Sequence, residues 1–439
     1  MPKPFRRVSA TLPRPLRPLV ALACACTMLM TGIPAAQAAP QAAPVLPSKD
    51  PFYTYTGSTP LSQIAPGTVL KKRKITLVIA SLTVPVATEQ VLYRTTGEQG
   101  QPTVTVTTII QPLTSLLGTK IVSYQTAYDA LGSQCDPSYT LRGGNPGDTD
   151  SQVEAAVIAL YVTAGYTVTV PDYEGTSLDW AAGQESGDGT LDGIRATENY
   201  LAVPTSTPVG MVGYSGGSIA TEWASELAPK YAPALDIIGA ASGGVPVDLA
   251  HNLTYINGDQ DWAGVIPAVL VTLSQSFGVN LNRYLSGYGK KITRAVAGEC
   301  IADFAANYPG LTYQQLLKPQ YQNVFSVPVL VRILNKLLMG TTPGHPEEPL
   351  LLGVGNADGT GDGIMIAGDV EGLAHEYCTQ GVPVTFDVYS GLEHTEAAVP
   401  FETDALTFLE NLFAGLPASN GCASIGIGNS LAPLPKPGK

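Results

Sequence analysis

The chain has 439 residues, 44% of them apolar, which suffices for one large domain or two to three ordinary domains with packed cores. Acidic residues outnumber basic residues by 36 to 24, and the formal net charge at pH 7 is −12. Such a charge repels nucleic acids and anionic lipid head groups, and no segment combines clustered basic and aromatic residues. We therefore predict no nucleic-acid partner, and nothing in the sequence implies a protein partner.

The first 38 residues have the pattern of a secretory signal peptide. Basic but no acidic residues occur in 1–17, the apolar run "PLVALACACTMLMTGIP" fills 18–34, and Ala36–Ala38 match a cleavage site. We predict cleavage after Ala38 and secretion to the extracellular space. The remaining chain has 19 basic and 36 acidic residues, a net charge of −17.

The exported chain keeps an even number of cysteines, which predicts two disulfides with three possible connectivities. No CxxC motif or His/Cys pair has the spacing of a metal site, so we predict neither a metal nor a cofactor. The four cysteines are Cys135, Cys300, Cys378 and Cys422.

A Pro/Ala-rich linker at 39–50 leads into β-rich runs between about 66 and 111, which predict antiparallel strands at one edge of a sheet. After them, strands alternate with helices of 10 to 15 residues, a pattern typical of a mostly parallel α/β sheet. We predict strands at 120–125, 166–175, 208–214, 349–355 and 383–389, and helices at 151–163, 192–203, 367–380 and 400–413, with one more directly after Ser215.

Between about 245 and 345 this alternation stops. The apolar runs at 262–281 and 324–340 are interrupted by Pro, Gly, Ser or Gln, and neither is a plausible membrane span. We interpret them as helices of an inserted cap on one α/β domain covering 39–439, although periodicity alone also allows ordinary core helices.

The stretch "PVGMVGYSGGSIATEWASELA" (208–228) carries a G-x-S-x-G pattern around Ser215. A buried strand precedes this serine and an amphipathic helix follows it, which is the context of a nucleophile elbow. In an elbow the serine hydroxyl is exposed on a strained turn, and the N–H of the next residue, Gly216, faces the reacting carbonyl. An ordinary tight turn is the alternative interpretation.

A serine nucleophile needs a histidine base, and the chain has four histidines. His251 lies too near the nucleophile helix, His345 lies in a Pro-rich loop ahead of any acid-bearing strand, and His375 lies in the middle of a predicted helix. His394 follows the strand "VTFDVY", where a base can reach over the edge of the sheet, and we predict that it is the base.

The acid should follow the strand "PLLLGVG", where Asp358 and Asp362 compete within "GNADGTGDG". Counting forward from the strand favours Asp358. We prefer Asp358, because strand-end geometry fixes where a carboxylate meets the histidine while the following loop can lengthen. Alternating oxygens at 356–363 also resemble a calcium loop, although a Gly-rich turn explains them more simply.

Six short motifs occur together and in a fixed order along the chain. They resemble the secretory lipase family of the Candida antarctica lipase A type, and the resemblance extends over nearly the whole exported chain. The motifs are "DPFYTYTGS" (50–58), "LYRTT" (92–96), "YDALGSQCDPSY" (128–139), "DYEG" (172–175), "LDGIRATENY" (191–200) and "GYSGG" (213–217).

The resemblance implies an α/β-hydrolase fold with a helical cap, and hydrolysis of triacylglycerols and other apolar esters through an acyl-enzyme. "GYSGG" then makes Ser215 the nucleophile and Gly216 an oxyanion donor, "YDALGSQC" makes Asp129 the second donor, and "EH" at 393–394 makes His394 the base. The acid segment departs from the family pattern, since it has a Gly-rich insertion and no proline. Counted back from the next helix, Asp362 fits the family spacing better than Asp358.

The predicted function is therefore that of a secreted serine ester hydrolase, with a lipid or small-molecule ester as substrate and transient contact with a lipid interface. Two alternatives stay open: an acyltransferase on the same scaffold, and a non-catalytic binding protein with a hydrolase fold.

Overall fold

The computed structural model describes residues 43–115 and 118–436, so the predicted signal peptide and its cleavage site lie outside the described residues. The strands of the described residues form one sheet in the order β1-β2-β3-β5-β4-β6-β7-β8-β9. The β1–β2, β2–β3 and β3–β5 pairs are antiparallel. The β5–β4, β4–β6, β6–β7, β7–β8 and β8–β9 pairs are parallel. The strands are β1 (Val69–Ile79), β2 (Leu82–Thr96), β3 (Pro102–Ile110), β4 (Ile121–Gln125), β5 (Thr167–Pro171), β6 (Pro208–Tyr214), β7 (Asp236–Gly243), β8 (Leu350–Asn356) and β9 (Val384–Ser390).

The strands differ in sequence according to their place in the sheet. Central strands such as β6 are apolar and buried along almost their whole length, because helices cover both faces of a parallel sheet. The edge strand β1 carries the basic run at 71–74 and is largely accessible to solvent. Charged residues on an edge strand disfavour pairing with another chain.

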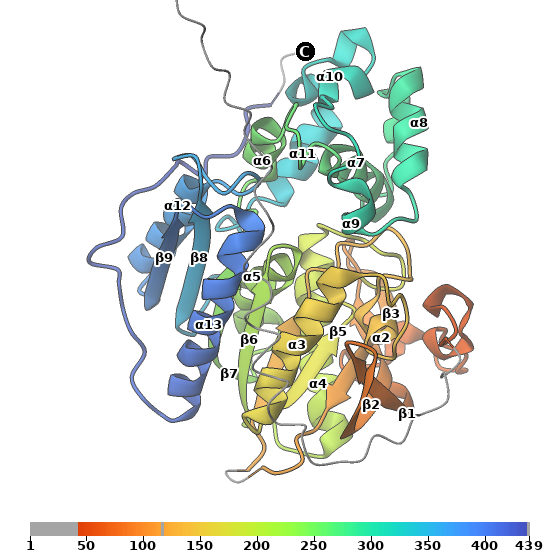
Figure 1. Cartoon of the computed structure of the whole chain (residues 1–439), viewed down its shortest axis with the longest axis vertical. Helices are drawn as coiled ribbons and strands as arrows, with labels where there is room; N and C mark the ends of the chain where they lie inside the picture. Colours follow the sequence, from red (N-terminus) through yellow and green to blue (C-terminus); the bar gives the residue numbers. More distant parts are fainter. Residues whose placement is uncertain (1–42, 116–117, 437–439) are drawn as a thin grey trace, which may run out of the picture. The chain divides into compact units, whose positions relative to one another are not determined.

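Helices pack on both faces of the sheet (Figure 1). On one face, Ile158 and Phe401 pack in one cluster with Val212, and on the other face Ile219 packs in a second cluster with Met211. Neighbouring strand residues therefore serve opposite cores, as the two-residue period of a strand requires. The first face carries α3 (Thr149–Thr163) and α13 (His394–Phe413), and the second carries α4 (Gly183–Leu201), α5 (Gly216–Tyr231) and α12 (Ala367–Thr379).

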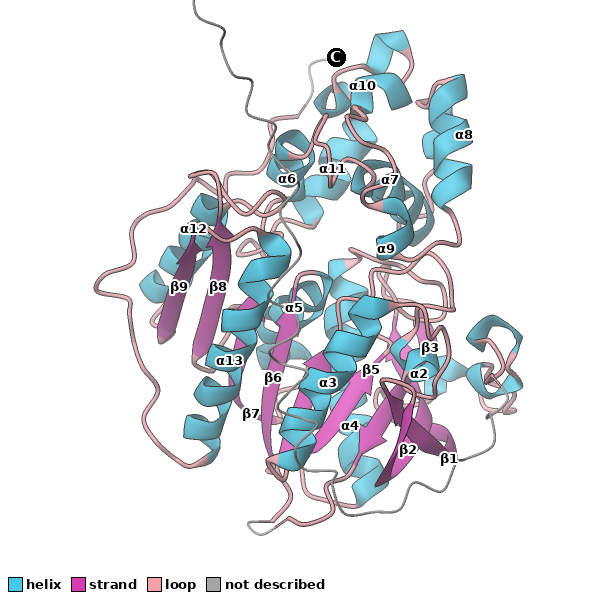
Figure 2. Cartoon of the chain, viewed as in Figure 1, coloured by secondary structure: helices cyan, strands magenta, loops and turns pink. Residues whose placement is uncertain are grey.

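Residues 244–349, here called the helical insertion, connect β7 to β8 and contain no strand of the sheet. The insertion lies beyond the carboxyl ends of the parallel strands and consists of helices and loops (Figures 1 and 2). None of the described helices is long and apolar enough to cross a membrane. The insertion contains α6 (Leu249–Tyr255), α7 (Val265–Ser276), α8 (Gly287–Val296), α9 (Ile301–Phe304), α10 (Tyr313–Leu316) and α11 (Pro328–Lys336), with 3₁₀ turns at Leu281–Arg283, Pro319–Tyr321 and Val324–Ser326.

Short helices also lie outside the insertion. One turn of helix, α2, follows β4, and three 3₁₀ turns precede β1. These elements are α2 (Pro137–Thr140) and the 3₁₀ turns Pro47–Lys49, Pro51–Tyr53 and Leu61–Gln63.

Two helices begin earlier than the sequence pattern predicts. Helix α4 begins at Gly183 rather than near 192. Its first turns are glycine-rich and polar although they are buried, so the sequence pattern does not indicate them. Helix α13 begins at His394 rather than at 400, and Pro400 lies inside it. Proline is common at the first position of a helix, so Pro400 looks like a helix start in the sequence although it lies inside the helix. His394 is therefore the first residue of a helix that was predicted to begin six residues later.

The four cysteines form two disulfides. Cys135 pairs with Cys300, and Cys378 pairs with Cys422. The prediction of two bridges is confirmed, and the structure selects one of the three connectivities. The first bridge joins the segment after β4 to the helical insertion, and the second joins α12 to the segment that follows α13.

Candidate active site

Ser215 lies at the turn between β6 and α5, with φ 54° and ψ −123°. This is a conformation that non-glycine residues rarely adopt, and it is the strained strand-to-helix turn that the G-x-S-x-G pattern predicts. The flanking glycines are required by close packing, because a Cβ at Gly217 would collide with the carbonyl of Gln125 and a Cβ at Gly213 would collide with Gly217 itself. Sequence and tertiary packing thus agree on an elbow.

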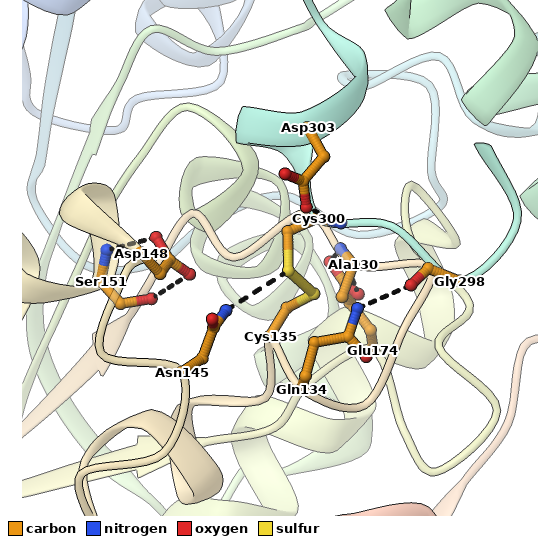
Figure 3. The surroundings of a disulfide bond; sticks show 10 residues. All are labelled: Ala130, Gln134, Cys135, Asn145, Asp148, Ser151, Glu174, Gly298, Cys300 and Asp303. Carbon is orange, nitrogen blue, oxygen red and sulfur yellow. Dashed lines mark hydrogen bonds between the residues drawn. A yellow bond between two sulfur atoms is a disulfide. The ribbon is translucent and has the colours of Figure 1, made fainter. Parts of the chain in front are cut away.

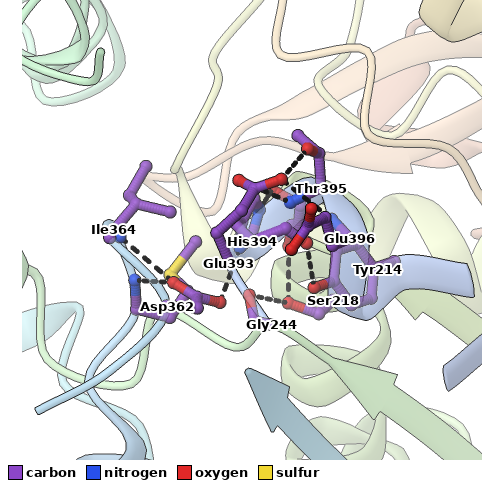
Figure 4. A network of polar contacts seen from close by, with 12 residues as sticks. Tyr214, Ser218, Gly244, Asp362, Ile364, Glu393, His394, Thr395 and Glu396 are labelled. Carbon is purple, nitrogen blue, oxygen red and sulfur yellow. Dashed lines mark hydrogen bonds and ion pairs between the residues drawn. The ribbon is translucent and has the colours of Figure 1, made fainter. Parts of the chain in front are cut away.

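A chain of hydrogen bonds joins a serine, a histidine and an aspartate. The Nε2 atom of His394 lies 2.7 Å from the Oγ of Ser215, and its Nδ1 lies 2.8 Å from the Oδ2 of Asp362. Figure 4 shows Asp362 facing His394. The histidine and the aspartate are both buried, while the serine is partly exposed. A base held by an acid on one side and bonded to a hydroxyl on the other is the arrangement that activates a serine.

Several contacts fix the orientation of this chain. The Oδ1 atom of Asp362 accepts hydrogen bonds from the backbone N–H groups of Ile364 and Met365, at 3.1 and 2.7 Å. The backbone N–H of His394 donates to the carbonyl of Asp362 at 2.9 Å, and the hydroxyl of Tyr214 donates to the carbonyl of His394 at 2.6 Å. Hydrogen bonds of both backbone and side-chain groups therefore hold Asp362 and His394 in place.

The structure contradicts the preference for Asp358 as the acid. The carboxylate of Asp358 is exposed and accepts hydrogen bonds from the N–H groups of Thr360 and Gly361 and from the hydroxyl of Tyr255. The Gly361 N–H in particular holds the pKa of this carboxyl below its usual value. The chain turns outward at 357–361 and returns, so that Asp362, rather than Asp358, lies beneath the histidine.

The two carboxylates within 356–363 make separate contacts. The carboxylate of Asp362 faces His394, whereas that of Asp358 closes its own turn. Among the described residues, no group of three or more His, Cys, Asp or Glu side chains is arranged to hold a metal ion.

Asp129 and Gly216, the two predicted oxyanion donors, lie side by side. Both line the same pocket as Ser215, and a Cβ at Gly216 would collide with the Asp129 carboxyl. The backbone of Asp129 has φ 36°, in the left-handed region, and the next residue, Ala130, donates its N–H to the buried carboxylate of Glu174. The loop after β4 is thus held in an unusual conformation beside the elbow.

The side chain of Asp129 is buried in an apolar environment. Burial raises the pKa of its carboxyl to about 7. Its Oδ1 and the Nε1 of Trp180 both lack a hydrogen-bond partner among the described residues, and Trp180 lines the pocket as well. Burial in such surroundings disfavours the charged form of a carboxyl.

The pocket above Ser215 is almost entirely apolar and holds about 520 Å³, its open mouth included. Trp180 and Ala181 line it from the segment before α4, and Ile364 and Met365 line it from the loop that carries Asp362. The helical insertion supplies most of the rest of the apolar wall, and Ile219 on α5 also contributes. The lining residues of the insertion include Leu249, Leu253, Ile256, Val265, Val269 and Ile301.

The other three histidines lie away from Ser215. His251 is on α6 and places its Nδ1 3.1 Å from both carboxylate oxygens of Asp369 on α12. His345 is exposed in the loop before β8, and His375 lies within α12. The elimination of these histidines from sequence position agrees with their places in the structure.

Sequence reasoning missed two aromatic residues of the site. Trp262 in the helical insertion lies edge-on to the His394 ring, with 5.3 Å between centroids, and Trp180 lines the pocket beside Asp129. Neither has a motif of its own. The available signal was slight. Trp262 lies in the segment 245–345, where the alternation of strands and helices stops, and Trp180 lies between the predicted strand 166–175 and the predicted helix 192–203.

The fold and the site define a class of protein. A mostly parallel sheet, a strained serine turn and a bonded Ser–His–Asp chain are the features of an α/β-hydrolase. The structure of Candida antarctica lipase A in its closed state is similar, with a TM-score of 0.78 and 30% sequence identity, over 89% of this chain and 93% of that chain. The predicted fold class, an α/β-hydrolase with a helical insertion, is confirmed.

Sequence comparisons identify the family. The family model described as secretory lipase matches residues 147–421. Lipase A of Arthroderma benhamiae is 34% identical over 406 residues, covering 87% of this chain and 83% of the relative. A Mycobacterium tuberculosis protein named as a probable inactive lipase is 33% identical over 389 residues, covering 86% and 84%. The chain belongs to the secretory lipase family, and its enzyme class is that of the lipases and carboxylic ester hydrolases.

Proposed function

We propose that this protein is a secreted serine hydrolase that cleaves apolar carboxylic esters through a covalent acyl-enzyme. The observation that carries the proposal is the hydrogen-bonded chain from Ser215 through His394 to Asp362, with distances of 2.7 and 2.8 Å. This chain opens into an apolar pocket, so an ester with an apolar acyl group would meet the serine hydroxyl there.

The proposed reaction uses this hydrogen-bonded chain. His394 donates its Nδ1 proton to Asp362 in a hydrogen bond and accepts the Ser215 hydroxyl proton at Nε2 as the oxygen attacks the ester carbonyl. The backbone N–H groups of Gly216 and Asp129 stabilise the negative oxygen of the tetrahedral intermediate. The histidine then protonates the leaving alcohol. Water, activated by the same histidine, attacks the acyl-enzyme and releases the carboxylic acid and the free serine.

The substrates that fit best are triacylglycerols and other esters with apolar acyl groups. Nearly all the pocket wall is apolar, and the helical insertion supplies much of it. We propose that the insertion acts as a cap over the acyl chain and makes transient contact with a lipid interface. Membership of the secretory lipase family, two disulfides and the signal-peptide pattern of 1–38 support an extracellular location.

A fluorophosphonate probe tests the nucleophile directly, because it phosphonylates only an activated serine. We expect one label per chain, on Ser215, together with hydrolysis of p-nitrophenyl butyrate. The variant Ser215→Ala should lose both and keep its melting temperature, while exchange of the exposed Ser419 for alanine should change neither.

Each open alternative has its own result in the same assay. Since the relative from Mycobacterium tuberculosis is named as inactive, an unlabelled and inactive wild-type chain would favour a binding protein. Formation of a butyrate ester rather than butyrate, with methanol present at millimolar concentration in water, would favour an acyltransferase.

A further inference from the structure

The loop that carries the Asp129 donor, residues 126–135, is held from two sides. On the side of the sheet, Glu154 accepts the N–H of Ala127 at 2.8 Å, and Glu174 accepts the N–H of Ala130 at 3.1 Å. Asp129 lies between these two bonds in a left-handed conformation that a residue with a side chain keeps only when its surroundings enforce it. The position of its amide therefore depends on what holds the far end of the loop.

The helical insertion holds that far end. The N–H of Leu131 donates to the carbonyl of Glu299 at 3.0 Å, and the side-chain amide of Gln134 donates to the carbonyl of Gly298 at 2.6 Å. The disulfide between Cys135 and Cys300 closes the same contact covalently (Figure 3). Three ties thus connect one short stretch of the insertion to the loop.

The stretch 298–301 is also part of the pocket wall. Ile301, next to Cys300, lines the pocket over Ser215 and begins helix α9. The two cysteines pack with Tyr128 and Ala130 in one small buried cluster, so the bridge is enclosed among the residues that flank Asp129. A displacement of the bridge would move both the oxyanion loop and one side of the acyl pocket.

We infer that the Cys135–Cys300 disulfide positions the active site: it holds the Asp129 amide at the oxyanion site by fastening its loop to the helical insertion. This inference rests on the proposed function, in which that amide is a donor. Loss of one oxyanion donor lowers turnover by about 10² to 10³-fold, and a displacement near 1 Å can cost about 10²-fold. Loosening the loop without removing the amide should therefore lower kcat by roughly 10- to 100-fold.

The second disulfide supplies a matched control. Cys378 and Cys422 join α12 to the segment after α13, and neither residue lines the pocket or belongs to the oxyanion loop. Both bridges close long stretches of chain, with sequence separations of 165 and 44 residues, so removal of either is expected to lower the melting temperature. Only removal of the first should lower turnover per folded molecule.

The experiment compares the full exported chain with Cys135→Ala/Cys300→Ala and with Cys378→Ala/Cys422→Ala, at a temperature well below all melting transitions. Fluorophosphonate titration counts the folded sites, and kcat and KM are measured with p-nitrophenyl butyrate. Inhibition by butylboronic acid, which forms a tetrahedral adduct with an active serine, reports on the oxyanion site separately.

We expect kcat per titrated site to fall 10- to 100-fold in the first variant, with KM changed less than threefold and boronic acid affinity lowered by a similar factor to kcat. The control variant should stay within twofold of the wild type in all three. An unchanged kcat in the first variant, an equal loss in both variants, or a loss confined to KM would overturn the inference.

A second experiment breaks the Cys135–Cys300 bridge after the chain has folded, so the protein does not have to fold without it. The folded control variant retains only the Cys135–Cys300 bridge, so reduction with a phosphine, with thiols counted by mass spectrometry, should lower kcat by the same factor, and reoxidation should restore it. An unchanged kcat after full reduction would also overturn the inference.

Hydrogen exchange keeps the two proposals distinguishable. Residues 127–135 should exchange faster in the first variant and not in the control, whether or not the chain has activity. An inactive wild-type chain would refute the proposed function, whereas unchanged exchange of this loop would refute its attachment by the disulfide.

Discussion

Replacement of Asp362 by asparagine should abolish most turnover without unfolding the protein. Two backbone N–H groups, from Ile364 and Met365, donate to the Oδ1 of Asp362 and so require an acceptor at that position. An asparagine must therefore place its oxygen there and its NH₂ group toward the Nδ1 of His394. The histidine then accepts at Nδ1 and carries its proton on Nε2, where it can no longer accept the hydroxyl proton of Ser215.

The size of the loss follows from this tautomer. An aspartate-to-asparagine exchange that fixes the wrong tautomer in a Ser–His–Asp site lowers kcat by about 10⁴-fold. At about 1.36 kcal/mol per factor of ten, this corresponds to roughly 5.4 kcal/mol of transition-state stabilisation. The volume of the side chain and its two backbone bonds are preserved, so the melting temperature should change by only a few degrees.

The matched control is Asp358→Asn. Asp358 is exposed, and an asparagine oxygen can still accept from the N–H groups of Thr360 and Gly361, so kcat should change less than threefold. The assay is kcat for p-nitrophenyl butyrate per fluorophosphonate-titrated or circular-dichroism-verified folded chain. A loss above 100-fold in Asp358→Asn, with Asp362→Asn within tenfold of the wild type, would refute the tautomer argument and restore Asp358 as the acid.

Three further predictions concern the oxyanion site, the pocket and the response to pH. Gly216→Ala should lower kcat at least 100-fold per folded chain, because the added Cβ collides with the Asp129 carboxyl; full activity would contradict the proposed place of the donors. Leu253→Trp fills the pocket from the helical insertion and should lower kcat/KM at least tenfold more for a palmitate ester than for a butyrate ester, and equal losses would count against an acyl site. Burial raises the pKa of both Glu222 and Asp188 to about 8, so the folded state holds protons that the unfolded state has released above pH 4 to 5. The stability that these two groups contribute is fully present below their unfolded-state pKa values and is lost as the pH rises through 8; the melting temperature should fall by several degrees between pH 5.5 and pH 8.5, less steeply in Glu222→Gln, and a rise would refute the assignment.

Local patterns in the sequence were enough to determine the framework of the site. The apolar run of β6 followed by the amphipathic pattern of α5 predicts a strand-to-helix turn, and glycines around Ser215 leave the hydroxyl accessible there. His394 could be found because the chain has few histidines and because the connection after a late parallel strand must end near the nucleophile. The first inference depends on a short stretch whose conformation is set mainly by its own residues, and the second depends on the order of the elements along the chain.

Other features depend on contacts between distant segments. His394 is in the first turn of a helix, yet Pro400 makes that helix look shorter in the sequence, and only packing of the preceding turns against the sheet reveals its start. The pairing of Cys135 with Cys300 requires the helical insertion to return to the loop after β4, across 165 residues of chain. Spacing along the sequence contains no information about that approach.

The choice between the two candidate acids shows the same division most clearly. The sequence predicts that a carboxylate between β8 and α12 faces the histidine, because parallel strands bring the segments that follow β8 and β9 to one edge of the sheet. Which carboxylate does so was decided by the path of the loop. The N–H of Ala357 donates to the carbonyl of Gly361, which closes an outward turn around Asp358, and the N–H of Asp362 donates to the carbonyl of Met365, which brings the chain back beneath His394. A glycine-rich segment can follow many paths of similar local energy, so only its contacts with the rest of the folded chain select one.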